Sequence, residues 1–236
     1  MEDIQKFKNE LTWEEKAKLN PLFAIMTQEN FIDASNEMTE EQLSLFYGRG
    51  EQFWQRWFQV LLCDTNDKKE LRILDYGCGM GRIVNQAGNF SRHTYGVDIS
   101  KTQIENAKEY CPNKDKIQFL SLNENDFTIP LQNDFFDIVY SYAVLQHIKL
   151  RSSLVIAIDE MCRVLKKNGI LKIQVRTFHE YIGEGKIKFY RSMVFENYTL
   201  AFYLRKFGFL LIPRIKRIKH TNWGGAGSFY SLNGFK

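Results

Sequence analysis

The sequence predicts a doubly wound α/β fold with a mostly parallel sheet, preceded by N-terminal helices and closed by a terminal antiparallel hairpin. From Leu71 onward, short apolar runs alternate with longer amphipathic runs, which is typical of a parallel sheet covered by helices. Before Leu71 the apolar residues recur at helical spacing. Near the C-terminus two strand-like runs flank the short link KHTNWGGA, which favours an antiparallel pair.

Composition excludes several protein classes. The 236 residues are 44% hydrophobic and 25% charged, as in a globular protein with one α/β domain and additional helices. The net charge of +4 is too small to indicate nucleic-acid binding by itself. There is no apolar run of membrane-spanning length, and the polar N-terminal residues lack the apolar core of a secretory signal. We therefore expect a cytoplasmic protein.

The cysteines do not form a recognisable pattern. Cys63, Cys78, Cys111 and Cys162 are scattered without a CxxC pair. In a cytosolic chain this spacing argues against a disulfide framework and against a zinc site. We therefore expect reduced cysteines and no metal.

Residues 1–70 are expected to form a helical lid. The segments Thr12–Glu15 (TWEE) and Thr39–Gln42 (TEEQ) each match a capping box at a helix N-terminus. The second segment precedes a run of apolar residues at helical spacing. Gly48 and Gly50 interrupt that run, which predicts a break or kink in the helix.

Residues 71–236 are expected to form the core. Strands are expected over 71–77, 93–100, 117–123, the start of 135–145, and 169–177, with helices over 82–90, 101–110 and 152–165. A long loop over 177–193, a helix over 196–209, and strands over 210–218 and 227–235 are expected to follow. The last two strands form the predicted hairpin.

The segment Ile73–Arg82, ILDYGCGMGR, ends a strand in aspartate and then places glycines at alternate positions. A Walker phosphate-binding loop needs Lys-Ser/Thr where Arg82-Ile83 stands, and a dinucleotide loop needs G-x-G-x-x-G. S-adenosylmethionine fits better, because it has no phosphate and carries a sulfonium, an ammonium and a carboxylate. Asp75 can accept a hydrogen bond from the ammonium, and the helix N-terminus after Gly81 favours the carboxylate.

LDYGCGMG resembles the first motif of class I S-adenosylmethionine-dependent methyltransferases, whose fold is Rossmann-like. YGVDIS resembles the second-strand motif of this family, and NENDF resembles the segment that contacts adenine. FDIVYSYAVLQHI resembles the fourth-strand motif that lines the methyl-transfer cleft, and VLKKNGILKI resembles the turn into strand five. The GCGxGR and VLQHI forms are closest to the bacterial branch that acts on small molecules or sugars.

The resemblance implies a set of cofactor-binding residues. It assigns Asp98 to the ribose hydroxyls and places Asp126 and Phe127 at the adenine. The full expected set is Tyr47, Gly48, Asp75, Gly77, Cys78, Gly79, Gly81, Arg82, Asp98, Ile99, Asp126, Phe127, Ser141 and Tyr142. Three alternatives stay open: Asp98 caps the following helix, Asp126 is a solvated turn residue with Asn123, Glu124 or Asn125 serving instead, and Arg82 is exposed in the first helical turn.

His147 is the candidate catalytic base. It follows the fourth strand beside the cleft, and histidine titrates near neutral pH; a packing role beside the cofactor is the alternative. His179 and Tyr181 in the long loop and Trp223 in the terminal link are the candidate acceptor-binding residues. The basic run Arg214–His220 alternates with isoleucines, which indicates an edge strand with a solvated face.

The sequence-based hypothesis is methyl transfer from S-adenosylmethionine to a small molecule or saccharide, on a hydroxyl oxygen. A nucleic-acid methyltransferase is one alternative, although YSYA does not match the Asn/Asp-Pro-Pro-aromatic motif of amino-directed DNA enzymes. A cofactor-binding regulatory protein without turnover is the alternative from another class. The acceptor, the methylated atom and the oligomeric state are left open.

Overall fold

The computed structural model describes residues 11–26, 31, 38–58, 68–123, 127–148, 150–180, 188–196, 215–218 and 229–232. Its helices are α2 (Trp13–Leu19), α3 (Pro21–Ile25), α4 (Glu40–Trp57), α5 (Val84–Ala87), α6 (Lys101–Tyr110) and α7 (Arg151–Val164). Its strands are β1 (Arg72–Tyr76), β2 (His93–Asp98), β3 (Ile117–Ser121), β4 (Phe136–Ser141), β5 (Leu165–Glu180), β6 (Lys188–Glu196), β7 (Ile215–Ile218) and β8 (Phe229–Leu232). Three short 3-10 turns, η3 (Lys68–Glu70), η4 (Lys114–Lys116) and η5 (Leu145–His147), complete the described elements.

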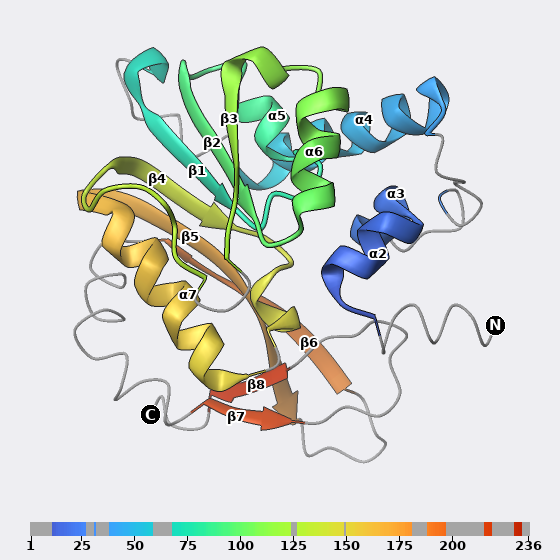
Figure 1. The fold of residues 1–236 in the computed structure, drawn as a ribbon. Helices are drawn as coiled ribbons and strands as arrows, with labels where there is room; N and C mark the ends of the chain where they lie inside the picture. The colour runs from blue at the N-terminus through green and yellow to red at the C-terminus, as the bar shows by residue number, and fades with distance from the viewer. Residues whose placement is uncertain are drawn as a thin grey trace.

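The first five strands form a parallel sheet in the order β3-β2-β1-β4-β5 (Figure 1). The chain winds outward from β1 through β2 to β3, then crosses back to β4 beside β1. The direction of winding therefore reverses between β1 and β4, and open α/β sheets bind ligands at the carboxyl ends of such strands. The predicted doubly wound parallel sheet is confirmed for these strands.

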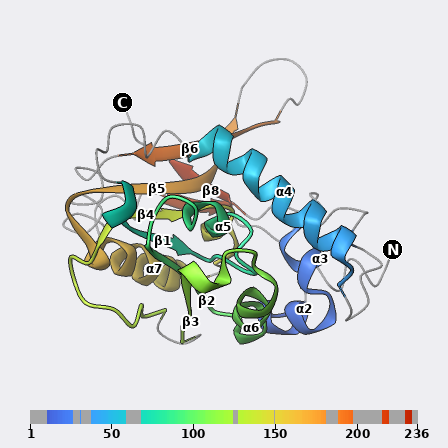
Figure 2. The ribbon, with the colours of Figure 1, turned by 90° about the horizontal axis from the view of Figure 1, so that it is seen from above.

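Helices cover both faces of this sheet. Ile73 and Ile138 point to the face covered by α4, α5 and α6. Leu74 and Val139 point to the opposite face, where α7 packs. Figure 2 shows α4 and α7 on opposite sides of β1 and β4. Successive strand residues alternate between two apolar layers, because side chains of a strand point alternately to its two faces.

The N-terminal helices begin where the sequence predicts. Thr12 Oγ1 accepts from the Glu15 amide at 3.2 Å, while Glu15 Oε2 accepts from the Thr12 amide at 2.7 Å. Thr39 and Gln42 form the same reciprocal pair at the start of α4, at 3.2 and 3.0 Å. Both capping boxes are confirmed, because each pair satisfies two amides that a helix start leaves open.

The predicted break in the second helix is wrong. α4 runs without interruption from Glu40 to Trp57, through both glycines. A Cβ atom at Gly50 would collide with the backbone oxygen of Arg82, whereas Gly48 has open space around it. Gly50 is therefore explained by the close approach of α4 to the chain after β1, and not by a change in backbone direction.

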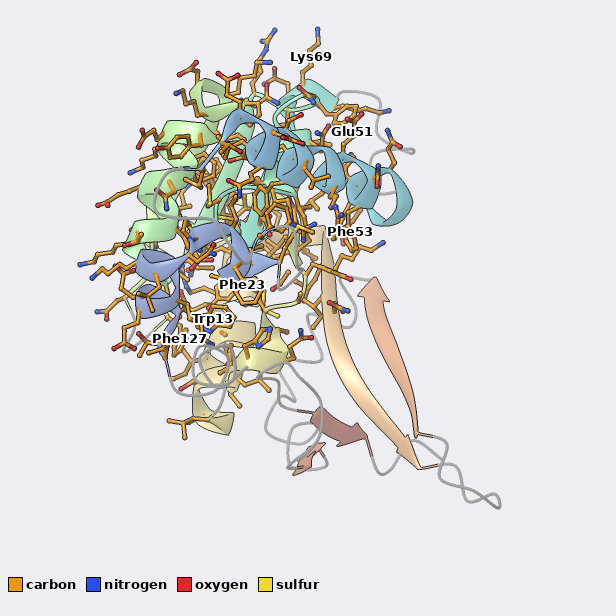
Figure 3. All side chains as sticks on the ribbon, turned by 90° about the vertical axis from the view of Figure 1, so that its right-hand side faces the viewer. Trp13, Phe23, Glu51, Phe53, Lys69 and Phe127 are labelled. Atoms are coloured by element: carbon orange, nitrogen blue, oxygen red, sulfur yellow. The ribbon has the colours of Figure 1, made fainter. Side chains whose placement is uncertain are left out.

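The long loop expected over residues 177–193 is also wrong. β5 continues to Glu180, and β6 pairs with it antiparallel from Lys188↔Glu180 to Glu196↔Lys172. Each strand supplies the backbone partners of the other, so the ladder extends well past the point where β4 ends. In Figure 3 the β5 and β6 strands reach away from the helices together.

The end of the chain differs from the expected closure of the sheet. β7 and β8 pair antiparallel with each other, from Ile215↔Leu232 to Ile218↔Phe229. β8 meets β5 through one pair, Thr177↔Tyr230, in the parallel direction. The predicted closure of the sheet by a terminal antiparallel hairpin is therefore not shown and stays a prediction. The expected helix over 196–209 lies outside the described residues apart from its first position, and α5 is shorter than the expected helix over 82–90.

Candidate functional site

The glycine-rich loop between β1 and α5 makes the tight turn that its sequence predicts. Gly77, Gly79 and Gly81 have φ angles of +80°, +54° and +82°, a backbone conformation that side chains disfavour. The amides of Gly77 and Cys78 donate to the Val97 carbonyl at 2.8 and 3.0 Å. These bonds hold the loop beside the carboxyl end of β2.

Asp98, the last residue of β2, is bound to the glycine loop. Its Oδ2 accepts from the Gly79 amide at 2.8 Å, and its Oδ1 accepts from the Ser100 amide at 2.9 Å. Burial raises the pKa of Asp98 above its ordinary value. The residue that caps α6 is Ser100, whose hydroxyl accepts from the Gln103 amide. The alternative of Asp98 as the cap of this helix is therefore wrong, and Ile99 lies half-buried between the two residues.

Asp75 brings a second acidic group to the same place. It lies in β1, one residue before the strand ends, and only 3% of it is exposed. Burial and the neighbouring Asp98 carboxylate raise the pKa of Asp75 to about 8. Two buried acidic groups at neighbouring strand ends make this part of the sheet favourable for a cation.

Arg82 is the cation nearest to this loop that the sequence singled out. Its Nε is buried without a hydrogen-bond partner, and burial lowers the pKa of its guanidinium. The guanidinium carbon lies 6.0 Å from the ring centre of Phe46 and 5.8 Å from that of Phe53, both on α4. The alternative of an exposed Arg82 is therefore wrong, because α4 covers it.

The carboxyl end of β4 lies beside the same loop. Ser141 is buried, and its hydroxyl donates to the Tyr76 carbonyl at 2.8 Å. The Tyr142 ring contacts Phe53 of α4, with 4.1 Å between ring centres. The strand end therefore joins β1 on one side and α4 on the other.

Tyr47 and Gly48 have different surroundings. The Tyr47 hydroxyl donates to the Met80 carbonyl of the glycine loop at 2.9 Å, and burial raises its pKa. Gly48 is exposed on the outer side of α4. The expected helix break at these residues is wrong, since α4 is continuous. The assignment of Tyr47 and Gly48 to the cofactor stays a prediction.

The N-terminal helices α2 and α3 lie against the glycine loop and the start of α6. A Cβ atom at Gly79 would meet Ile25 Cδ1, at the end of α3, at 2.7 Å. Glu14 of α2 accepts from the Ser100 hydroxyl at 2.8 Å and from the Thr102 hydroxyl and amide at 2.7 and 3.2 Å. These bonds link α2 to the start of α6. Figure 3 labels Trp13 and Phe23 on the two helices.

Glu14 is a site residue that sequence reasoning missed. Burial opposes its ionisation, but the hydrogen bonds from Thr102 and Ser100 outweigh this and lower its pKa to about 2. In the sequence Glu14 is one of two adjacent glutamates inside a capping box, and Glu15 is the one that performs the capping. Its partners lie far along the chain, so no local pattern distinguishes it.

His147 lies in η5, close to the carboxyl end of β4. The Trp13 ring meets its imidazole edge to face, with 4.9 Å between ring centres. Gln146 Nε2 lies 3.3 Å from His147 Nε2. The structure therefore places His147 between the sheet edge and α2, and its role as a base stays a prediction.

The remaining predicted site residues are only partly described. The Phe127 amide donates to the Asn123 carbonyl at 3.0 Å, and Phe127 has a φ of +55°. His179 lies in β5, where its backbone pairs with Phe189 of β6. Asp126, Tyr181 and Trp223 lie outside the described residues. The assignments to adenine and acceptor therefore stay predictions.

Within the described ranges, no group of three or more His, Cys, Asp or Glu residues is arranged to hold a metal ion. None of the helices in this part of the chain combines the length and apolar character that crossing a bilayer requires. At this edge of the sheet, a ligand would meet the glycine loop, the acidic pair and Arg82.

Comparison with known proteins identifies the domain that carries this geometry. A family described as a methyltransferase domain matches residues 74–173. An O-methyltransferase of ubiquinone biosynthesis from Pelagibacter ubique is 28% identical over 123 residues, covering 50% of this chain and 49% of the relative. A methyltransferase of uncharacterised activity from Anoxybacillus flavithermus is 23% identical over 214 residues, covering 87% of this chain and 94% of the relative.

The YcgJ protein of Bacillus subtilis is similar among solved structures, with 23% identity and a TM-score of 0.43, covering 50% of this chain and 49% of that one. The chain spans about half the length of the first curated relatives that it matches. The matched segment begins in β1 and ends in β5, so it contains the glycine loop, Asp98 and the end of β4. From β1 to β5, over residues 74–173, the chain is therefore similar to methyltransferase domains.

Proposed function

We propose that this protein transfers a methyl group from S-adenosylmethionine to a small acceptor molecule. The observation that carries the proposal is the acidic pair, Asp75 and Asp98, on either side of a glycine loop with three positive φ angles. Two acidic groups beside a glycine-rich loop suit a cationic ligand that lies against the backbone. They do not suit the phosphates of a dinucleotide, which would need added positive charge.

The residues of the loop fit this cofactor. A Cβ atom at Gly79 would meet Ile25 Cδ1 at 2.7 Å, so among the described residues the flexible end of Ile25 occupies the space in front of this glycine. We assign Asp98 to the ribose hydroxyls and Asp75 to the ammonium, as the family pattern implies. We assign Arg82 to the carboxylate, because its buried Nε has no hydrogen-bond partner among the described residues.

The bound cofactor supplies an electrophilic methyl group on a positively charged sulfur. The residues of the chain have to align the acceptor with that methyl group and keep water out. The end of β4 provides one wall, because Tyr142 packs against Phe53 of α4. Methyl transfer by alignment of the acceptor and exclusion of water needs no metal and no covalent intermediate.

The lid belongs to the proposal as well. Residues 1–70 supply α2, α3 and α4, and residues 71–236 supply the sheet. Ile25 covers Gly79, and Glu14 fastens α2 to α6. We assign to α2 and α3 the role of closing over the glycine loop, so that the cofactor replaces the Ile25 side chain when it enters.

The acceptor in this proposal is a small molecule or a saccharide with a reactive hydroxyl. Two relatives are named for small molecules: the ubiquinone biosynthesis O-methyltransferase and a sterol 24-C-methyltransferase of Neurospora crassa, 30% identical over 129 residues. A hydroxyl acceptor must lose a proton, and His147 is the histidine beside the end of β4. The buried cysteines Cys78, Cys111 and Cys162 are not joined in a disulfide, which supports a location in the reducing cytoplasm.

Calorimetry with S-adenosylmethionine and S-adenosylhomocysteine tests the cofactor. Both are expected to bind, and Asp98→Ala is expected to weaken binding by about 1–3 kcal/mol through loss of charge-assisted hydrogen bonds. Gly79→Val is expected to abolish binding, because a branched side chain fills the ligand space and resists a φ of +54°. Binding of NAD with no heat from either compound would overturn the assignment.

Turnover separates an enzyme from a binding protein. Production of S-adenosylhomocysteine is measured across a panel of metabolites and saccharides, with an oligonucleotide as the nucleic-acid arm. Tight cofactor binding without turnover on any acceptor would favour the regulatory alternative.

Once an acceptor is identified, the role of His147 can be tested. His147→Ala is expected to lower kcat about 10²–10⁴-fold if His147 is the base. A stable variant within a few-fold of the wild-type rate would assign the imidazole to packing against Trp13.

A further inference from the structure

The chain turns sharply after β4 at Tyr142, Ala143 and Val144, three residues that we call the β4 corner. Ala143 has a φ of +60°. This left-handed conformation is unfavourable, because it places an alanine Cβ close to its own carbonyl group. A backbone outlier of this kind persists only where its surroundings hold it.

One buried side chain holds the β4 corner. The Ala143 amide donates to Gln174 Oε1 at 2.8 Å. Gln174 is on β5, and only 6% of it is exposed. β4 and β5 are parallel neighbours, paired at Ser141↔Ile173, so the residue after Ile173 lies beside the point where β4 ends. The amide carbonyl of Gln174 therefore replaces the strand partner that the Ala143 amide loses at the corner.

The two residues flanking Ala143 face the cofactor loop and the lid side of the sheet. A Cβ atom at Gly77 would meet Val144 Cγ1 at 2.7 Å, so the Val144 side chain lies directly against the glycine loop. The Tyr142 ring lies 4.1 Å from the Phe53 ring. A shift at Ala143 moves both neighbours, because they share its backbone.

We propose that Gln174 is a positioning residue for methyl transfer, which fixes the β4 corner and thereby sets Tyr142 and Val144 beside the glycine loop. The inference rests on the proposed function for its reaction and on the Ala143–Gln174 hydrogen bond for its geometry. Gln174 acts through the corner backbone. A displacement of about 1 Å at a reacting centre can cost about 100-fold in rate, so a small change at the corner is measurable.

Two substitutions isolate the hydrogen bond. Gln174→Leu keeps a similar side-chain volume and removes the acceptor, whereas Gln174→Glu keeps a carbonyl-type oxygen at the same reach. At saturating cofactor and acceptor, the Leu variant is expected to lose ten- to hundredfold in kcat, and the Glu variant to stay within about threefold of wild type. The Ala143 amide is expected to exchange its proton faster in the Leu variant than in wild type.

A core variant controls for general destabilisation. Ile117→Ala opens a cavity on β3, which β2 and β1 separate from β4 and its corner, and is expected to lower Tm without lowering kcat. A Gln174→Leu protein with normal kcat would overturn the proposal, and so would a Glu variant as slow as the Leu variant, because the acceptor atom would then be irrelevant.

A failure of the proposed function can be distinguished from a failure of the role of Gln174. If wild type binds S-adenosylhomocysteine but shows no turnover, enzymatic transfer fails, and the corner is tested through the affinity for this compound. Gln174→Leu is then expected to weaken that affinity at least fivefold, with Gln174→Glu unchanged. Equal affinity in all three proteins would overturn the role of Gln174.

Discussion

Asp75 shows how a single residue can be unfavourable for folding and suited to binding. Its carboxyl is buried beside Asp98, and its pKa is raised from 3.8 to about 8. An acid with a raised pKa binds its proton more tightly in the folded state than in the unfolded state. The free energy of unfolding therefore falls as pH rises from about 4 to about 8, where the unfolded chain has already lost the proton that the folded chain retains.

We predict that Asp75→Asn is more stable than wild type at pH 8 and equally stable near pH 4, because an amide carries no charge to bury. The same variant is expected to bind S-adenosylmethionine more weakly, since it cannot offset the positive charge of the ligand. Thermal melts at the two pH values and calorimetry check the two expectations. The exposed Asp115→Asn removes one negative charge elsewhere and serves as the control; a stability gain equal to that of the control would contradict the prediction.

Glycines of one helix can have opposite roles, as Gly48 and Gly50 of α4 show. We predict that Gly50→Ala lowers the free energy of unfolding by about 1–3 kcal/mol, because its Cβ would collide with the Arg82 carbonyl and force α4 outward. Gly48→Ala is the matched control and is expected to raise it by up to about 1 kcal/mol, since alanine is the better helix former. Urea unfolding measures both. Similar shifts in the two variants would mean that α4 is not seated against Arg82.

At the scale of elements, the attachment of α2 to α6 depends on one carboxylate. We predict that Glu14→Ala lowers the free energy of unfolding by about 1–3 kcal/mol, since the Ser100 and Thr102 hydroxyls and the Thr102 amide lose their acceptor. The folded-state pKa of Glu14 is about 2, below its ordinary 4.5. Its contribution is therefore complete above pH 4.5 and disappears as pH falls through 2.

Denaturant unfolding and amide exchange in α2 measure the effect of Glu14→Ala. Lys18→Ala is the matched control, because it removes the exposed Lys18–Glu14 ion pair at 3.4 Å and leaves the bonds to α6 in place. The control is expected to change the free energy of unfolding by less than about 1 kcal/mol. Equal effects of the two variants would assign the α2 attachment to charge alone.

Local sequence signals predicted elements whose partners are near in the chain. Thr12 and Glu15 satisfy each other's amides three residues apart, so their capping box was readable. The prediction of a break at Gly48 and Gly50 was wrong. Gly50 is required by the close contact with Arg82, which lies in the chain after β1. The tight turn at Gly77, Gly79 and Gly81 was predicted correctly, because φ angles that favour glycine are a local property of the chain.

At the scale of the whole molecule, the alternation of apolar runs was sufficient to predict the parallel sheet and its winding, because burial of both faces leaves a strong pattern. The pairing of β6 with β5 was missed, although Gly183 and Gly185 between the two strand segments are a hairpin signal. The Ala143–Gln174 hydrogen bond could not be predicted from the sequence either, because it joins two strands through a side chain. What the sequence leaves undetermined is therefore the set of contacts between elements.

Ligand binding should stabilise the molecule as a unit. We predict that S-adenosylhomocysteine at about 100 times its Kd raises the free energy of unfolding by about 2.7 kcal/mol. For a chain of this size that corresponds to an increase in Tm of about 5–11 °C. Thermal melts with and without the compound provide the measurement, and NAD at the same concentration serves as the control. A comparable increase with NAD would show that the loop does not discriminate between the two.

The contact between Ile25 and Gly79 also bears on how long a ligand stays. A compound held against the glycine loop cannot leave while α3 covers it and Glu14 keeps α2 fastened to α6. Its residence time is then set by the opening rate of these helices and not by its own contacts alone. In rapid-mixing experiments the first turnover would be fast and later ones slow, with accumulated product acting as an inhibitor. Glu14→Ala would shorten the residence time and abolish that burst.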